Sequence, residues 1–132
     1  MYRLLILLFL LFTNSEEAKI GWTSRYDPNP MNATIELRQE WGQLPQNLEM
    51  YDGFVAVADC DRIGEETYLK PINATQFERF LVVDCAGSQQ AYNWMVENNI
   101  IVEVDYTTAE RWGCLVKSVE IVEIRAKKEK KK

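Results

Sequence analysis

The sequence predicts one small, mainly β domain that folds as a closed barrel. Short apolar runs of strand length recur along the second half of the chain, and turn-forming residues bound them. Several of these runs are apolar on both faces, which is typical of the strands of a small closed barrel. The chain has 132 residues, 47% of them hydrophobic and 27% charged, which suffices for one domain with its own core.

Strands are expected at five places in the second half of the chain. The first four runs are short and largely apolar, whereas the last alternates polar and apolar residues and should expose one face. These runs cover residues 54–58, 67–69, 80–83, 100–104 and 116–124. Residues 16–52 are interpreted as an N-terminal extension that carries one short helix.

Helical segments are expected beside the strands. Asn29 and Pro30 have the form of an N-cap followed by proline at the first helical position, so a helix over residues 31–41 should begin there. Ser88 can cap a second helix over residues 88–98. Thr107 and Glu110 have the spacing of a capping box, which predicts a single turn that ends at Gly113.

The first 15 residues have the layout of a secretory signal peptide. Arg3 precedes an apolar run over residues 4–12, and residues 13–15 offer small side chains where a signal peptidase cleaves. The apolar run is about nine residues long, shorter than the roughly 20 needed to span a bilayer. A membrane anchor and a buried helix or strand are the alternatives. We therefore expect a secreted or periplasmic, cell-envelope protein with no stable membrane span after cleavage.

The charge distribution argues against nucleic acid as a partner. The net charge is −5, and residues 16–126 are more acidic than this value suggests because residues 127–132 are mostly lysine. An acidic surface repels phosphate backbones. The lysine-rich tail is interpreted as a disordered end, with contact to an anionic lipid or polymer as the alternative.

The three cysteines allow one disulfide in an oxidising compartment. Cys60 and Cys85 each follow an aspartate at the end of an apolar run, so they form a candidate pair if the two runs are neighbouring strands. Three unpaired buried thiols, with Cys114 as the third, are the alternative.

The residue types present restrict the chemistry. The sequence contains no histidine, which excludes Ser-His-Asp and Cys-His nucleophile systems and the usual zinc hydrolase sites. It also has no CxxC spacing, so no metal is expected, and no cofactor is expected either. Catalysis would have to rest on carboxylates, Tyr, Lys, Ser or Cys.

Asp59, Asp84 and Asp105 each follow a predicted strand. A carboxylate at the end of a buried strand is partly desolvated, which raises its pKa, and neighbouring carboxylates raise one pKa further. Such a group can donate a proton near neutral pH if the three side chains share one groove. The alternative is that each aspartate caps a local turn.

The segments around these aspartates resemble the three-aspartate (3D) domain. The most specific part is Ala109-Glu110-Arg111-Trp112-Gly113, which follows an aspartate-bearing strand. The other matching segments are residues 55–59, 63–64, 67–69, 82–87 and 102–106. That domain is related to rare-lipoprotein-A-like proteins and to the barrel of membrane-bound lytic transglycosylase A. The resemblance implies a six-stranded double-psi β-barrel over residues 53–126, with one or two short peripheral helices.

The resemblance also implies a function. In related lytic transglycosylases one aspartate acts as general acid and then as general base on a β-1,4 glycosidic bond of peptidoglycan. By position, Asp84 would take that role, with Asp105 beside it and Asp59 orienting the site. Substrate contacts are expected from Trp94, Tyr106 and Gly87.

Two functions therefore stay open. One is cleavage of a cell-wall glycan, as a lytic transglycosylase or a glycoside hydrolase. The other is non-catalytic binding of a glycan or of a protein partner by a secreted barrel. Residues 88–99 replace the short, glycine-containing loop that follows the corresponding aspartate in the family.

Overall fold

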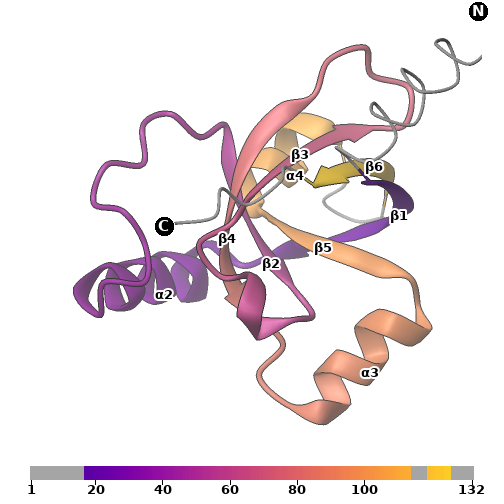
Figure 1. Ribbon diagram of the computed structural model, residues 1–132. Helices are drawn as coiled ribbons and strands as arrows, with labels where there is room; N and C mark the ends of the chain where they lie inside the picture. Colours follow the sequence, from indigo (N-terminus) through magenta and orange to yellow (C-terminus); the bar gives the residue numbers. More distant parts are fainter. Residues whose placement is uncertain (1–16, 114–118, 126–132) are drawn as a thin grey trace, which may run out of the picture.

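Six strands form a closed barrel in the order β1-β5-β2-β4-β3-β6 (Figure 1). The structure is a computed structural model that describes residues 17–113 and 119–125. Its elements are β1 (Glu17–Tyr26), α2 (Pro28–Glu40), β2 (Gly53–Val57), η1 (Cys60–Arg62), β3 (Glu66–Pro71), β4 (Glu78–Cys85), α3 (Gln89–Glu97), β5 (Ile100–Asp105), α4 (Tyr106–Trp112) and β6 (Val119–Arg125). The prediction of a mainly β barrel with peripheral helices is confirmed.

The two halves of the chain have the same arrangement. Strand β1 pairs with β5 in parallel and with β6 in antiparallel, just as β4 pairs with β2 in parallel and with β3 in antiparallel. Exchanging the first three strands for the last three leaves every pairing unchanged. A helix also follows the first strand of each half, α2 or α3, and a shorter one follows the second strand, η1 or α4. Asp59 and Asp105 therefore occupy corresponding positions, each directly before a short helix.

Inward-facing side chains from five of the elements fill the barrel. Strand β5 shows the alternation clearly, because its buried and partly exposed residues follow one another with a period of two. The core consists of Val55, Val57, Leu69, Phe80, Val82, Val102, Val104 and Ala109. Phe80 also packs edge-on against Trp112 of α4, with ring centroids 5.7 Å apart.

A second apolar cluster fixes helix α2 to the outer face of β4. It contains Met31 and Ile35 of the helix, Leu44 of the following loop, and Leu81 and Val83 of the strand. The helix begins at Pro28, with Asp27 at the N-cap, so it starts earlier than the expected Asn29 cap. Both prolines fit the first turn because backbone N–H groups there have no partner within the helix.

The N-terminal boundary of the barrel was predicted wrongly. Residues 17–26 form β1, a strand between β5 and β6, so the barrel begins at Glu17 rather than at residue 53. The sequence conceals this strand because its buried positions hold the small residues Gly21 and Thr23, while Ile20 and Trp22 are exposed. Gly21 is required there, since a Cβ atom would lie 2.5 Å from Ile101 and 2.9 Å from the carbonyl oxygen of Asn99.

The other helices follow the sequence more closely. Ser88 caps α3 by accepting a hydrogen bond from the N–H of Ala91 at 3.1 Å, as predicted. Gly113 ends α4 in the left-handed conformation, with φ of 77°, also as predicted. The cap of α4 is Asp105 and not Thr107, so this helix begins two residues earlier than expected.

Some expectations concern residues that the structure does not describe. The signal peptide over residues 1–15, the lysine-rich tail over residues 127–132 and Cys114 lie outside the described residues. Within residues 17–113 and 119–125, no helix is both long and apolar enough to cross a membrane.

Candidate functional site

The disulfide joins the two elements that carry Asp59 and Asp84. Cys60 at the start of η1 is bonded to Cys85 at the end of β4, with their Cα atoms 4.9 Å apart. The parallel pairing of β2 with β4 brings these two ends together, since Val57 is the register partner of Cys85. The candidate pair from the sequence is therefore confirmed.

The three predicted aspartates do not meet in one groove. Strand β2 runs parallel to β4, so Asp59 and Asp84 lie towards the same end of the barrel. Strand β5 runs antiparallel to β2, so Asp105 lies beside Phe54, five residues before Asp59 and two residues from the level at which Ala56 pairs with Asp84. From Phe54 to Asp59 the chain advances by about 16 Å at the rise of a strand.

Asp105 acts as the cap of α4. Its Oδ1 accepts hydrogen bonds from the N–H of Phe54 at 3.0 Å and from the hydroxyl of Thr108 at 2.7 Å. Its Oδ2 accepts a third, from the N–H of Thr108 at 3.3 Å. These bonds tie the end of β5 to the start of β2, which is a structural role.

Asp59 occupies the N-cap position of η1, but its side chain makes no capping hydrogen bond. The residue is exposed and contributes to a small pocket of about 220 Å³. Lys19, Tyr92 and Asn99 are among the other residues of this pocket, which lies between β1, η1 and α3. The side chain of Asp59 thus caps no turn, and no contact among the described residues joins it to Asp84.

Asp84 is held by two side chains from the N-terminal part of the chain. The hydroxyl of Tyr26 donates to its Oδ2 at 2.6 Å, and Nη2 of Arg38 donates to its Oδ1 at 2.9 Å. The side chains of Arg38 and Asp84 are each 17% exposed, so solvent still reaches the ion pair. Sequence reasoning missed Arg38 because it lies 46 residues before Asp84.

A β-bulge turns Asp84 towards α2. Val55 pairs with Val82 but the next residue, Ala56, pairs with Asp84, so Val83 is an extra residue in β4. Val83 packs in the outer cluster under α2 and Asp84 bonds to Arg38 of the same helix. The bulge therefore carries both side chains to the outer face of the barrel.

A second carboxylate, Glu103, lies in the same cross-strand row. Ala56 is the register partner of Asp84 on one side and of Glu103 on the other, and Glu103 pairs in turn with Ser24. Two strand spacings separate Asp84 from Glu103, so their Cα atoms are about 10 Å apart. Glu103 is the one charged side chain in the apolar run 100–104, which was the signal in the sequence.

The environments of these two carboxylates differ. Burial of the side chain raises the pKa of Glu103, and the negative charge of Asp84 adds to that effect. Asp84 instead accepts hydrogen bonds from a phenol and a guanidinium, which fix the position of its carboxyl group. Two carboxyl groups whose surroundings differ in this way can divide the roles of acid and base.

Tyr26 remains a hydrogen-bond donor at any physiological pH. Burial, the hydrogen bond to Asp84 and the charge of Asp84 together raise its pKa to about 12. Its hydroxyl therefore keeps its proton and continues to hold Asp84 in place.

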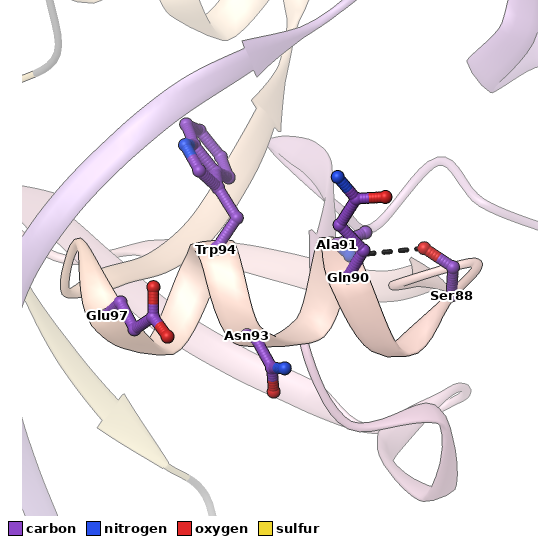
Figure 2. Close-up of a pocket in the computed structure, with 6 residues that line it drawn as sticks. All are labelled: Ser88, Gln90, Ala91, Asn93, Trp94 and Glu97. Atoms are coloured by element: carbon purple, nitrogen blue, oxygen red, sulfur yellow. Dashed lines mark hydrogen bonds between the residues drawn. The ribbon is translucent and has the colours of Figure 1, made fainter.

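The predicted substrate-binding residues are also separated. Trp94 is 50% exposed on α3 and lines a pocket on the surface of that helix (Figure 2). Gly87 lies in the exposed loop before the helix, with open space around its Cα. Tyr106 begins α4 beside Asp105, where the guanidinium of Arg25 lies 6.0 Å from its ring centroid.

Two further observations bear on the site. The described residues contain no group of three or more acidic or cysteine side chains that could hold a metal ion. No model of a protein family and no curated protein matches the sequence.

Proposed function

We propose that this protein is exported and cleaves a β-1,4 glycosidic bond of peptidoglycan, with Glu103 and Asp84 as its two carboxylates. The observation that carries the proposal is the position of these residues on either side of Ala56, where burial raises the pKa of Glu103 and a phenol and a guanidinium hold Asp84. Paired carboxyl groups of this kind are what glycosidases use, at separations of about 5–9.5 Å.

In this proposal the general acid is Glu103 and not Asp84. A general acid must carry a proton at the working pH, and the raised pKa of Glu103 favours this. Glu103 donates its proton to the leaving glycosidic oxygen. Asp84, positioned by Tyr26 and Arg38, stabilises the positive charge that develops on the sugar ring as the bond from C1 to the leaving oxygen breaks. Water or the 6-hydroxyl of the same sugar then attacks C1 and gives its proton to the Glu103 carboxylate, which restores the acid.

The strand arrangement supports the proposed family. A barrel of two equivalent halves, each contributing a strand to a parallel pair with the other, agrees with a double-psi β-barrel. On this proposal the chain is a divergent relative of the three-aspartate (3D) and rare-lipoprotein-A-like domains. Its two carboxylates would then be Glu103 and Asp84 on either side of Ala56, in place of aspartates at the strand ends.

Export is supported by two independent features. Residues 1–15 have the composition of a signal peptide, and the Cys60–Cys85 disulfide is a bond that persists in oxidising compartments. Both favour a place outside the cytoplasm, where a cell-wall glycan is accessible.

The test is incubation of the mature protein with purified peptidoglycan, followed by chromatography and mass spectrometry of the soluble fragments. The wild type should release fragments, while Glu103→Gln and Asp84→Asn should reduce the rate at least about 100-fold, the typical contribution of a general acid. Glu110→Gln is the matched control, because Glu110 is exposed on α4 away from the pair. Release by Glu103→Gln at the wild-type rate would exclude the proposed acid. The mass of the fragments also distinguishes hydrolysis from formation of a 1,6-anhydro end.

A second function is favoured by one feature of the same cluster. Both oxygens of Asp84 are already hydrogen-bonded, and the ion pair with Arg38 fastens α2 to the barrel. That arrangement also suits a non-catalytic barrel that binds a glycan or a protein partner. Sedimentation with insoluble peptidoglycan, without release of fragments by any variant, would support this function instead.

A further inference from the structure

We propose that the outer surface of α3 is a binding site for a neutral glycan chain, distinct from the carboxylate pair. This α3 surface consists of Ser88, Gln90, Ala91, Asn93, Trp94 and Glu97, which line one open pocket (Figure 2). The inference deepens the proposed function, because it gives the glycan a second point of attachment, but binding here does not require cleavage.

Trp94 stays half exposed although its helix packs against the barrel. Met95 is the residue of this helix that is buried, with 2% exposure, whereas half of the Trp94 side chain is exposed. Gln90, Trp94 and Glu97 follow the spacing i, i+4, i+7, so they share one side of the helix. Figure 2 shows the indole and the Gln90 amide projecting from the helix in the same direction.

The polar groups around the indole are available to a ligand. Among the described residues, the side chains of Gln90 and Glu97 and the indole N–H of Trp94 have no hydrogen-bond partner. Asn93 uses its carbonyl oxygen to accept from Gln89 at 2.9 Å, which leaves its amide N–H groups unused. Gln90 and Glu97 thus lie one turn before and one turn after Trp94 on the helix. Figure 2 shows Asn93 projecting away from the indole.

This combination selects a neutral sugar over other ligands. A pyranose ring has an apolar C–H face that packs on an indole, and its hydroxyl or acetamido groups can bond to amide and carboxylate side chains. An anionic polymer is disfavoured, because the one charged residue of the α3 surface is the acidic Glu97. An apolar peptide would cover these polar groups without satisfying their hydrogen bonds.

The α3 surface lies close enough to the carboxylate pair for one chain to reach both. Ser88 follows Asp84 by four positions in the chain, so their Cα atoms are at most about 14 Å apart. The disulfide between Cys60 and Cys85 anchors the start of this connection to η1. An oligosaccharide bound on α3 can therefore extend towards Asp84.

The experiment is calorimetric titration of the full mature chain with a hexamer of β-1,4-linked N-acetylglucosamine. Glu103→Gln serves as the background, so that the ligand is not consumed. Adding Trp94→Ala should weaken binding at least about tenfold, which corresponds to 1.4 kcal/mol. Trp41→Ala is the matched control, because Trp41 is 61% exposed near the end of α2 and is not part of the α3 surface. This control should bind like its background.

Two outcomes would overturn the inference: equal affinity of the Trp94→Ala and Trp41→Ala variants, or absence of binding to the hexamer. If Trp94→Ala does not fold, Gln90→Ala with Glu97→Gln replaces it, and a loss of about fivefold or more is expected from their two exposed hydrogen-bonding groups. Cleavage is scored separately on the wild-type background. Loss of affinity in Trp94→Ala with no cleavage by any variant would retain the α3 site and reject the proposed enzyme.

Discussion

Glu103 and Asp84 flank Ala56 across three adjacent strands, β5, β2 and β4, on the outer face of the barrel. The methyl side chain of Ala56 between them has no hydrogen-bonding atom, so it cannot bridge the two carboxyl groups. Each carboxylate therefore depends on its own surroundings: Asp84 on Tyr26 and Arg38, and Glu103 on a partly buried position on β5.

The raised pKa of Glu103 predicts how stability depends on pH. A carboxyl group whose pKa is higher in the folded state stabilises the fold fully below its unfolded pKa, near 4.5. That stabilisation is lost as the pH rises through the folded pKa. Relative to Glu103→Gln, the wild type should become progressively less stable between about pH 4.5 and neutral pH. Urea unfolding of both proteins at several pH values measures this. A constant difference between them over that range would contradict the prediction.

Tyr26→Phe should destabilise the protein by about 1–2 kcal/mol, because it removes the hydrogen bond from the tyrosine hydroxyl to the partly solvated carboxyl group of Asp84. Urea unfolding at neutral pH gives this difference. An ultraviolet absorbance titration provides a second readout, since the tyrosine step near pH 12 should be absent from the variant. Tyr106→Phe, which leaves Tyr26 and its hydrogen bond to Asp84 in place, should retain that step. A titration curve of Tyr26→Phe with an unchanged high-pH step would contradict the assignment.

Gly21→Ala should destabilise the barrel by about 1–3 kcal/mol. The added methyl group would lie 2.5 Å from the side chain of Ile101 and 2.9 Å from the backbone oxygen of Asn99, so β1 and β5 would have to separate. Gly87→Ala is the matched control, because nothing lies within 4 Å of the position its methyl group would take. The control should stay within about 0.5 kcal/mol of the wild type in thermal or urea unfolding. Equal stability of the two variants would argue against the β1–β5 pairing.

The sequence was sufficient for the apolar strands and for the capped helices. Residues 54–58 and 80–83 point to buried strands because almost every position is apolar, and Ser88 and Gly113 mark helix ends by local chemistry. The disulfide could be proposed for a similar reason, as each cysteine follows an aspartate at the end of an apolar run.

What the sequence concealed depends on contacts between distant residues. Strand β1 places glycine and threonine inward, so its pattern lacks the apolar period of a strand. Arg38 reaches Asp84 because α2 packs on β4, and Tyr26 reaches it from the end of β1 that leads into α2. The divergence of the three aspartates follows from strand direction, because β5 runs opposite to β2. None of these relationships is encoded in local spacing.

Asp105→Ala should cost about 2–3 kcal/mol of stability. The substitution removes the cap of α4 and leaves the N–H of Phe54 and the hydroxyl of Thr108 without their acceptor. Asp59→Ala is the control at the corresponding position of the first half, where the side chain makes no capping bond. It should change the free energy of unfolding by no more than about 0.5 kcal/mol.

The Asp105→Ala variant also tests whether Asp105 has a structural or a catalytic role. At a temperature where Asp105→Ala remains folded, its rate of fragment release from peptidoglycan should match that of the wild type, because the Asp105 carboxylate bonds to Phe54 and Thr108 and not to Glu103 or Asp84. If a folded Asp105→Ala protein releases no fragments, Asp105 takes part in the reaction. The active site would then be formed by the aspartates at the strand ends, as the sequence predicted. Circular dichroism on each sample, recorded beside the release assay, establishes that the comparison is made between folded proteins.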